Sequence, residues 1–196
     1  MSMPYSVVYC DRCSYRGATF IMWGIFRYRF DDGHETYIDR MLGWCSGCGG
    51  VQPIERLPNR AEIEKELDAT RRRLRKLNPT GLIGRLTLMI SRRRHEEVGQ
   101  LRERERDLEH LSLMVASRTA SARCLECSSV SVSPMPISPH EEKHYDHPIG
   151  VVHPGCDGAL RIRDSGGSRL AFAFEPRVYD LDGRPITVDR KGNDPT

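Results

Sequence analysis

The sequence predicts an α+β fold in which two small β-rich modules are joined by a helical hairpin. All seven cysteines lie near the ends of the chain, within residues 10–48 and 124–156. The stretch between these two groups has apolar residues at helical spacing. Only 38% of the 196 residues are hydrophobic, which suits several small modules better than one large core. We therefore expect three parts, at residues 1–58, 59–120 and 121–196.

The first module, residues 1–58, contains two cysteine pairs with two residues inside each pair. Two intervening residues let one tight turn supply two thiolates, and a tetrahedral Zn²⁺ ion takes four such ligands. No secretory leader is recognisable, so we expect a cytoplasmic protein, in which persistent disulfides are rare. We therefore predict a first structural zinc site made by Cys10, Cys13, Cys45 and Cys48.

A β-hairpin is predicted between these two pairs. Residues 18–30 are rich in β-branched and aromatic side chains, Asp31-Asp32-Gly33 is a turn sequence, and residues 36–44 return towards the second pair. Alternation along the first strand places Arg27 and Arg29 on the same face as Trp23. Arginines interleaved with aromatic rings can stack on nucleic-acid bases, although packing of the rings in a small core is the stronger interpretation.

The third module, residues 121–196, is predicted to hold a second structural zinc ion. Seven cysteines cannot fill two all-thiolate sites, and the last cysteine lies three residues after a histidine. The predicted ligands are Cys124, Cys127, His153 and Cys156. Three other histidines compete with His153 for the fourth position, or form a weaker catalytic metal site with an open position: His140, His144 and His147.

Further strands are expected after this site. Residues 159–163 and 169–174 have strand-like patterns, and Gly166-Gly167 is predicted to turn the chain between them. Asp182-Gly183 is a hairpin signal, with residues 185–188 as the returning strand.

A knuckle, a hairpin and a second knuckle resemble a zinc ribbon, the small module found in transcription factors, RNA polymerase subunits and adaptor proteins. Both terminal modules resemble it at their ligand positions and flanking turns, and His153 departs from the four-cysteine version. The resemblance implies structural zinc and a recognition role. It does not choose among DNA, RNA and protein as the partner.

The middle segment is predicted to form two helices. Ile63, Leu67, Leu74 and Leu77 make an apolar stripe that Thr70 completes, with Asn59 as the N-cap. Residues 78–81 stop this helix, and a second helical pattern covers residues 82–118. Its apolar stripe consists of Leu86, Ile90, Val98, Leu101, Leu108, Leu111 and Val115. A short connection favours an antiparallel hairpin. The longer helix would leave apolar side chains uncovered, so contact with a zinc module, or a homodimer with coiled-coil packing, is a hypothesis.

The helical segment is also the most basic part of the chain. Residues 59–123 contain sixteen basic and ten acidic side chains, a net charge of +6. A phosphate backbone is one partner for such a surface, and ion pairs with carboxylates elsewhere in the chain are the alternative. The candidate nucleic-acid contacts are Arg71, Arg72, Arg73, Arg75, Lys76, Arg92, Arg93 and Arg94, together with Arg27 and Arg29.

These patterns favour a non-enzymatic protein that uses two structural zinc ions and acts as a recognition or adaptor element through protein–protein contacts. Nucleic-acid binding at the basic helical bend is the alternative, and metal-dependent hydrolysis at the three other histidines is the weaker one. The sequence contains neither a nucleophile-elbow motif nor a phosphate-binding glycine loop. It also has no apolar run long enough to span a membrane.

Overall fold

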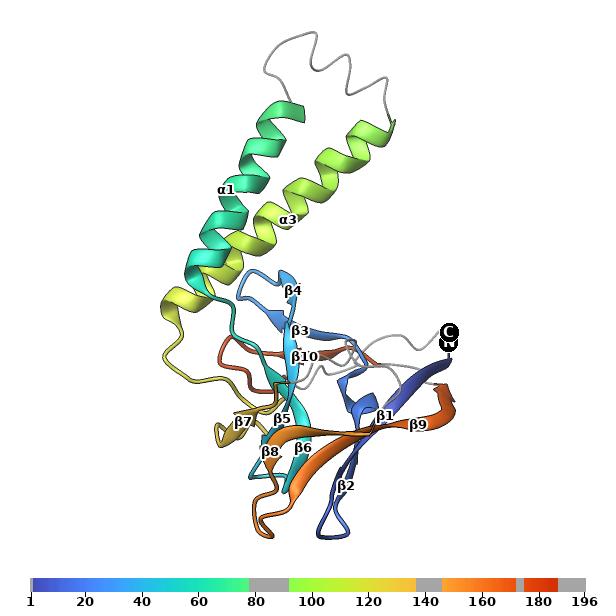
Figure 1. Ribbon diagram of the computed structural model, residues 1–196. Helices are drawn as coiled ribbons and strands as arrows, with labels where there is room; N and C mark the ends of the chain where they lie inside the picture. The colour runs from blue at the N-terminus through green and yellow to red at the C-terminus, as the bar shows by residue number, and fades with distance from the viewer. Residues whose placement is uncertain (1, 78–91, 137–145, 172–174, 187–196) are drawn as a thin grey trace, which may run out of the picture. The chain divides into compact units, whose positions relative to one another are not determined.

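The computed structural model describes residues 2–77, 92–136, 146–171 and 175–186 (Figure 1). Over these residues the fold is α+β, as predicted, and it divides into two compact units. The β unit comprises Met1–Arg29, Tyr37–Arg56 and Ala120–Thr196. The helical unit comprises Phe30–Thr36 and Leu57–Thr119.

The two ends of the chain belong to one unit, which corrects the predicted separation of residues 1–58 from residues 121–196. Strand β1 (Ser2–Cys10) pairs antiparallel with β9 (Ala159–Ala171), so that Cys10 lies opposite Leu160. Neither predicted module therefore forms its sheet alone. The other end of the chain supplies the neighbouring strand, as β9 does for β1. In sequence order, the two helices form an insertion in this β unit.

Three sheets contain the described strands (Figure 1). The largest has the order β2-β1-β9-β8, with β2 at Arg16–Ala18 and β8 at His147–Val152. The second has the order β6-β5-β7, from Arg40–Cys45 (β5), Gly50–Glu55 (β6) and Val132–Pro134 (β7). The third has the order β10-β3-β4, from Phe26–Arg29 (β3), Glu35–Tyr37 (β4) and Arg177–Tyr179 (β10).

The strand predicted at residues 18–30 is interrupted. Thr19–Met22 forms a 3₁₀ helix, η1, and Gly24 has a φ of +123°. A backbone in that region suits glycine and breaks a strand. From Phe26 onward the expected alternation holds, because Phe26 and Tyr28 are buried while Arg27 is half-buried. The turn at residues 31–33 is confirmed by a 2.9 Å hydrogen bond from the Gly33 N–H to the Phe30 carbonyl.

The main core of the β unit lies under the cysteine-bearing strands. Val8, Leu42 and Leu160 are fully buried, and they pack in one cluster with Trp44 and Met135. These residues come from β1, β5, β9 and the end of β7, so the core joins segments from both ends of the chain. Burial of such side chains contributes roughly 1.5–3 kcal/mol each.

The buried carboxylate of Glu55 connects several segments in a second part of the β unit. Glu55 is 1% exposed; its Oε1 accepts a 2.7 Å hydrogen bond from the Tyr28 hydroxyl, and its Oε2 accepts a 2.8 Å hydrogen bond from the Arg123 N–H. The turn at Gly183 packs directly on this carboxylate. Because a buried carboxylate without partners costs several kcal/mol, these contacts constrain β3, β6 and the C-terminal turn together.

The C-terminal strands differ from the prediction at one turn. Strand β9 continues through Gly166, which has a φ of +74°, so the predicted turn at Gly166-Gly167 is wrong. The turn at Asp182-Gly183 is confirmed by a 3.0 Å hydrogen bond from the Gly183 N–H to the Asp180 carbonyl. The predicted returning strand is represented by a bridge between Tyr179 and Pro185.

The helical unit contains the predicted hairpin, built from α1 (Arg60–Leu77) and α3 (Arg92–Ser117). Asn59 is the N-cap of α1, because its Oδ1 accepts a 2.9 Å hydrogen bond from the Ala61 N–H. The predicted stripe is buried at Ile63 and Thr70 on α1, and at Val98 and Leu108 on α3. Neither described helix is long and apolar enough to cross a membrane.

Ion pairs cross between the two helices in antiparallel order. Arg71 lies 2.9 Å from Glu105 and 2.6 Å from Glu109. Arg73 lies 2.5 Å from Glu97 and Arg104 lies 2.7 Å from Glu66. Part of the basic charge predicted at the bend is therefore neutralised inside the helical unit. Exposed pairs of this kind are worth about 0.2–1 kcal/mol each.

Two stacked histidines connect the tip of the β3–β4 hairpin to α3 within the helical unit. The rings of His34 and His110 are 4.4 Å apart. His34 Nε2 lies 2.7 Å from Asp107, and His110 Nε2 lies 2.9 Å from Asp32. His110 Nδ1 lies 2.8 Å from the carbonyl of residue 106, which only accepts hydrogen bonds. Both ring nitrogens of His110 therefore face acceptors, which favours the charged imidazolium.

The His110–Asp32 pair gives a pH prediction. Desolvation lowers the pKa of His110, but the carbonyl of residue 106 and Asp32 raise it by more, so the net shift is upward. The His34 N–H and His110 lower the pKa of Asp32. The His110 contribution to stability is lost as pH rises through its folded pKa, and the Asp32 contribution is lost as pH falls through its folded pKa. Both are fully present between about pH 4 and pH 6.5.

We expect Asp32→Asn to lower the pKa of His110, as measured by NMR titration of the imidazole. Asp31→Asn is the matched control, because Asp31 is exposed in the same turn and makes no contact with His110. An equal shift in both variants would contradict a specific pair.

Candidate metal centres

The eight predicted ligands form two clusters, but their grouping differs from the prediction. One cluster, here called the outer cluster, contains Cys10, Cys13, His153 and Cys156. The other, the inner cluster, contains Cys45, Cys48, Cys124 and Cys127. In each cluster all four ligand atoms lie within 4.8 Å of one another. Each cluster can therefore hold one metal ion, and the inner cluster is nested in sequence inside the outer one.

The predicted sites joined neighbouring cysteine pairs, and this grouping is corrected by strand pairing. The β1–β9 ladder brings Cys10 to the strand that follows Cys156. The β5–β7 ladder places Cys45 opposite Val132, five residues after Cys127. Hydrogen bonding between strands that are distant in sequence thus decides which pairs meet. The distance along the chain does not.

In the outer cluster, the Cys10 and Cys156 sulfurs are 3.3 Å apart. His153 presents Nδ1 to the cluster, at 2.9 Å from the Cys156 sulfur and 3.4 Å from the Cys13 sulfur. The choice of His153 over the other histidines agrees with this arrangement. Because Nδ1 lies among the sulfurs, it is the ring atom that would bind a metal ion here.

Backbone contacts shape each outer turn, and a pair of hydrogen bonds between Asp11 and Ala159 joins the two turns. The Arg12 N–H points at the Cys10 sulfur at 3.4 Å, and the His153 N–H donates to the Gly158 carbonyl at 2.7 Å. A Cβ at Gly158 would overlap the Cys10 sulfur and lie 2.9 Å from Asp11 Oδ1. Glycine is therefore required where the C-terminal turn approaches the N-terminal one.

In the inner cluster, Cys45 lies 3.5 Å from Cys127 and Cys48 lies 3.8 Å from Cys124, measured between sulfurs. Cys45 and Cys124 are fully buried at the ends of paired backbone, while Cys48 and Cys127 are exposed. The Cys48 N–H points at the Cys45 sulfur at 3.4 Å. Each turn therefore supplies one buried and one exposed thiolate.

The donor sets fit a tetrahedral ion. Metal–sulfur bonds of about 2.3 Å give tetrahedral edges of about 3.8 Å, and a nitrogen ligand shortens the edge by a few tenths of an ångström. The shortest separations in the two clusters, 2.9–3.8 Å, lie at or below these edges, and all pairs within a cluster lie within 4.8 Å. All seven cysteines are free thiols, so each sulfur remains available as a ligand.

The thiols within a cluster differ in acidity. Burial raises the pKa of Cys124 to about 11, and the pKa of Cys48 rises further for the same reason. Desolvation also acts to raise the pKa of Cys127, but the Ser129 N–H and the neighbouring sulfurs lower it overall. The lowered pKa of Cys127 favours its thiolate, and a charged sulfur in the cluster opposes ionisation of its neighbours. A bound cation stabilises all four, so metal binding releases protons.

Three aromatic rings connect the two clusters. The ligand His153 stacks on Tyr15 at 4.9 Å and meets Trp44 edge-on at 4.9 Å, while Tyr15 and Trp44 are 5.1 Å apart. Tyr15 follows the ligand Cys13 by two residues, and Trp44 immediately precedes the ligand Cys45. The sequence analysis assigned no role to Tyr15 or Trp44. Their positions beside ligands were the signal that could have identified them.

The other predicted histidines do not join these clusters. His147 lies in β8 opposite Ile162, and neither described cluster includes it. His140 and His144 lie outside the described residues. The predicted hydrolytic site therefore has one described residue, and it is placed in a strand.

The predicted nucleic-acid contacts divide into engaged and exposed side chains. Arg71 and Arg73 make the ion pairs described above, and the Arg94 Nε donates to the Leu77 carbonyl at 3.1 Å. In the β unit, the Arg27 guanidinium lies 5.0 Å from the ring centre of Tyr37, and Arg29 is half-buried in β3.

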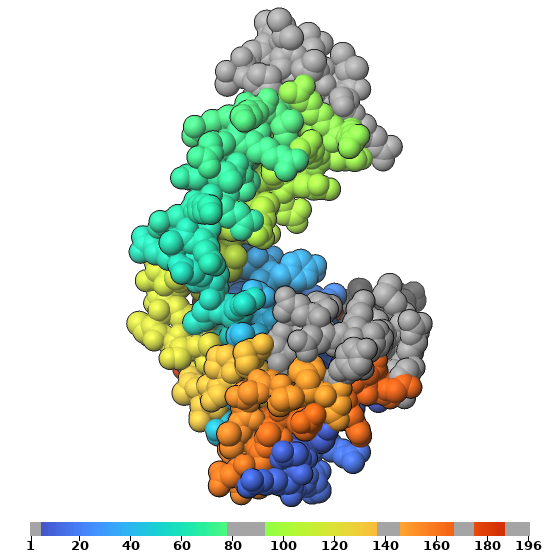
Figure 2. Space-filling view, in the orientation of Figure 1, coloured from blue at the N-terminus to red at the C-terminus, as the bar shows by residue number. Residues whose placement is uncertain are grey.

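The remaining described candidates are exposed on the helices. Arg72, Arg75 and Lys76 lie near the end of α1, and Arg93 lies at the start of α3. None of these four has an ion pair with another described residue. Arg92 begins α3. Figure 2 shows atoms of both helices at the surface of the helical unit.

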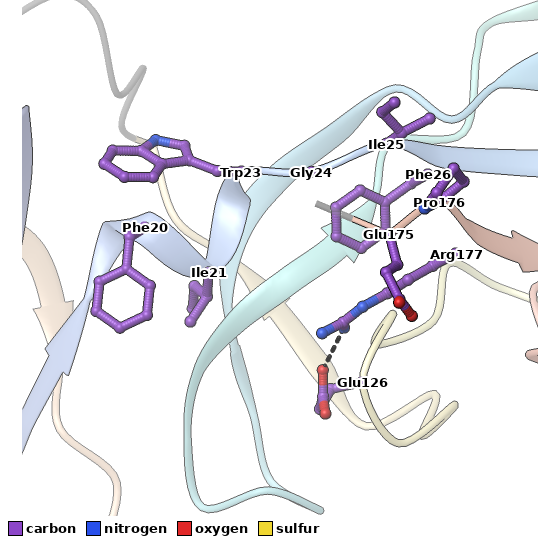
Figure 3. Close-up of a pocket in the computed structure, with 10 residues that line it drawn as sticks. All are labelled: Phe20, Ile21, Trp23, Gly24, Ile25, Phe26, Glu126, Glu175, Pro176 and Arg177. Carbon is purple, nitrogen blue, oxygen red and sulfur yellow. Dashed lines mark hydrogen bonds and ion pairs between the residues drawn. The ribbon is translucent and has the colours of Figure 1, made fainter. Parts of the chain in front are cut away.

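A pocket of about 450 Å³ lies beside the inner cluster (Figure 3). Phe20 and Trp23 form one wall, and an ion pair between Arg177 and Glu126, 2.6 Å long, forms another. In the sequence, Glu126 lies between Cys124 and Cys127, two candidate ligands of the inner cluster. The pocket is open and has both polar and apolar walls, without a clustered set of catalytic groups among its lining residues.

Comparisons with protein-family models, with curated proteins and with solved structures gave no match for this chain.

Proposed function

We propose that this chain is a non-enzymatic zinc-binding protein that acts as a recognition or adaptor element through protein–protein contacts in a larger complex. One observation supports the structural role of the metal: each cluster supplies four protein ligand atoms. A tetrahedral ion with four protein ligands has no position left for water or substrate. The metal then stabilises the fold and does not activate a nucleophile.

Zinc is the ion that these donors favour. Four thiolates, or three thiolates and an imidazole, are the common ligand sets of structural zinc. Zinc bound in this way contributes about 10–16 kcal/mol of apparent binding free energy in small metal-dependent domains. The two ions, one in each cluster, would stabilise the β unit, whose three sheets have three or four strands each beside a limited core.

Protein contact is favoured over nucleic acid because part of the basic charge of the helical unit is paired within the unit. Arg71, Arg73 and Arg104 each pair with a glutamate on the other helix. Leu113 on α3 is 67% exposed, an apolar side chain available to a partner helix or to a second copy of this chain. A helical hairpin with charges of both signs and an exposed leucine is suited to contact with the surface of another protein.

A second candidate is a polyanion, favoured by the exposed basic residues near the ends of the helices. Arg72, Arg75, Lys76 and Arg93 have no ion pair among the described residues, so their charges are available to phosphates.

Fluorescence anisotropy with labelled DNA and RNA, at low and near-physiological salt, distinguishes the two candidates. We expect the zinc-loaded protein to bind no more tightly than micromolar at near-physiological salt. The test variant reverses Arg72, Arg75 and Arg93 to glutamate. The control reverses Arg60, Lys65 and Arg102, which changes the net charge equally on the same helices. Sub-micromolar, salt-dependent binding that is lost only in the test variant would overturn protein contact as the main function.

A further inference from the structure

The ring cluster of Tyr15, Trp44 and His153 links ligands that belong to different metal centres. His153 is itself a ligand of the outer cluster, with Nδ1 2.9 Å from the Cys156 sulfur. Its ring has two aromatic neighbours, both at 4.9 Å. Aromatic pairs at this distance attract each other beyond the effect of simple burial. The orientation that His153 needs for metal binding is therefore stabilised by Tyr15 and Trp44.

Trp44 is in turn held by the strands that build the inner cluster. It is 5% exposed and lies in β5 next to the ligand Cys45. Its backbone is paired on both sides, with Val51 of β6 and with Ser133 of β7. A metal ion at the inner cluster would join the β5–β6 turn to residues 124–127. This connection lies close to the pairings of Trp44 with Val51 and Ser133. That metal therefore restricts the position of Trp44.

Tyr15 makes the same connection from the outer side. Its hydroxyl accepts a 2.7 Å hydrogen bond from the Val51 N–H, and Val51 lies opposite Trp44 in the β5–β6 ladder. Its carbonyl accepts a hydrogen bond from the N–H of the outer ligand Cys10 at 3.2 Å. One side chain thus contacts the backbone of the inner hairpin, while its own backbone supports the outer turn.

We propose that the two metal centres are energetically coupled through this ring cluster, so that zinc at one cluster strengthens zinc binding at the other. Trp44 is the positioning residue that transmits the effect, because it fixes the ring of His153 without binding metal itself. Linkage makes the effect reciprocal, and coupling of this type is commonly about 5–150-fold in affinity. This inference rests on the proposed binding of two zinc ions.

Native mass spectrometry of the full chain with a limiting amount of Zn²⁺ tests the coupling. Independent, equal sites give half of the molecules one zinc at half-saturation, whereas about tenfold coupling reduces that share to about a quarter. We expect Trp44→Leu to raise the one-zinc share and Trp44→Phe, which keeps a ring, to bring it back towards the wild-type value. Trp23→Leu is the matched control, since Trp23 is the other tryptophan and does not contact His153.

The outcomes separate the coupling from the zinc binding itself. An unchanged one-zinc share in Trp44→Leu would overturn the coupling through the rings while leaving two zinc ions per chain. Failure of the wild-type chain to retain zinc would instead overturn the proposed function. If Trp44→Leu does not fold, Tyr15→Leu makes the same comparison from the outer side. Absorption of the Co²⁺-substituted protein then identifies which cluster, S₃N or S₄, keeps its ion.

Discussion

Serine at both Cys10 and Cys156 is expected to leave a protein that binds one metal ion, whereas serine at both Cys10 and Cys45 is expected to leave none bound tightly. The first pair removes two ligands of the outer cluster alone. The second pair removes one ligand from each cluster. A site that has lost one of its four ligands binds zinc far more weakly, because the set no longer closes around the ion. Metal content per chain, measured after dialysis against a weak chelator, distinguishes the variants.

The same two variants also test the alternative grouping of ligands. If neighbouring cysteine pairs formed the sites, Cys10→Ser with Cys45→Ser would remove one site and spare the other, and Cys10→Ser with Cys156→Ser would damage both. The variant with serine at Cys10 and Cys45 would then bind one metal ion, and the variant with serine at Cys10 and Cys156 would bind none tightly. The Co²⁺ spectrum provides a check, since the ion that remains in Cys10→Ser with Cys156→Ser should have four sulfur ligands.

Alanine at Gly183 is expected to destabilise the β unit by roughly 2–5 kcal/mol. Gly183 has a φ of +77°, which costs a residue with a Cβ about 1–2 kcal/mol. The added Cβ would also overlap the Glu55 carboxylate, at 2.7 Å from its Cδ, and overpacking of this kind costs about 1–3 kcal/mol. Glu55 cannot move away without losing its hydrogen bonds to Tyr28 and Arg123. Thermal unfolding of the zinc-loaded protein measures the loss.

Gly150→Ala is the matched control for this substitution. Gly150 lies in the same unit and has the same φ of +77°, but a Cβ added there would have no described atom within 4 Å beyond its chain neighbours. Its substitution should cost only the backbone strain of about 1–2 kcal/mol. Equal losses at the two glycines would show that the contact with Glu55 has no energetic effect.

The ligands could be predicted from sequence because each turn is local. Two residues between cysteines, or between His153 and Cys156, define a turn wherever the turn lies in the fold. The grouping could not be predicted in this way, because it depends on pairing between β1 and β9, whose residues are more than 140 positions apart. The predicted sites assumed that neighbours in sequence are neighbours in space.

The helices were predictable for a similar reason. Asn59 and the stripe through Ile63 and Thr70 are local signals, and all three have the expected roles. On α3 the stripe was incomplete, since the fully buried Met114 was not included in it. The strand expected at residues 18–30 is interrupted before Phe26 because β-propensity cannot identify the 3₁₀ helix at Thr19–Met22 or the positive φ at Gly24.

The nested order of the two clusters has a consequence for the chain during its synthesis. The first 48 residues contain four thiols, at Cys10, Cys13, Cys45 and Cys48, that belong to different centres. Proteins are made from the N-terminus, and contacts distant in sequence form slowly. Until residue 156 is made, the outer cluster cannot be completed. Zinc captured on those first four thiols during synthesis would have to exchange ligands before the native arrangement could close.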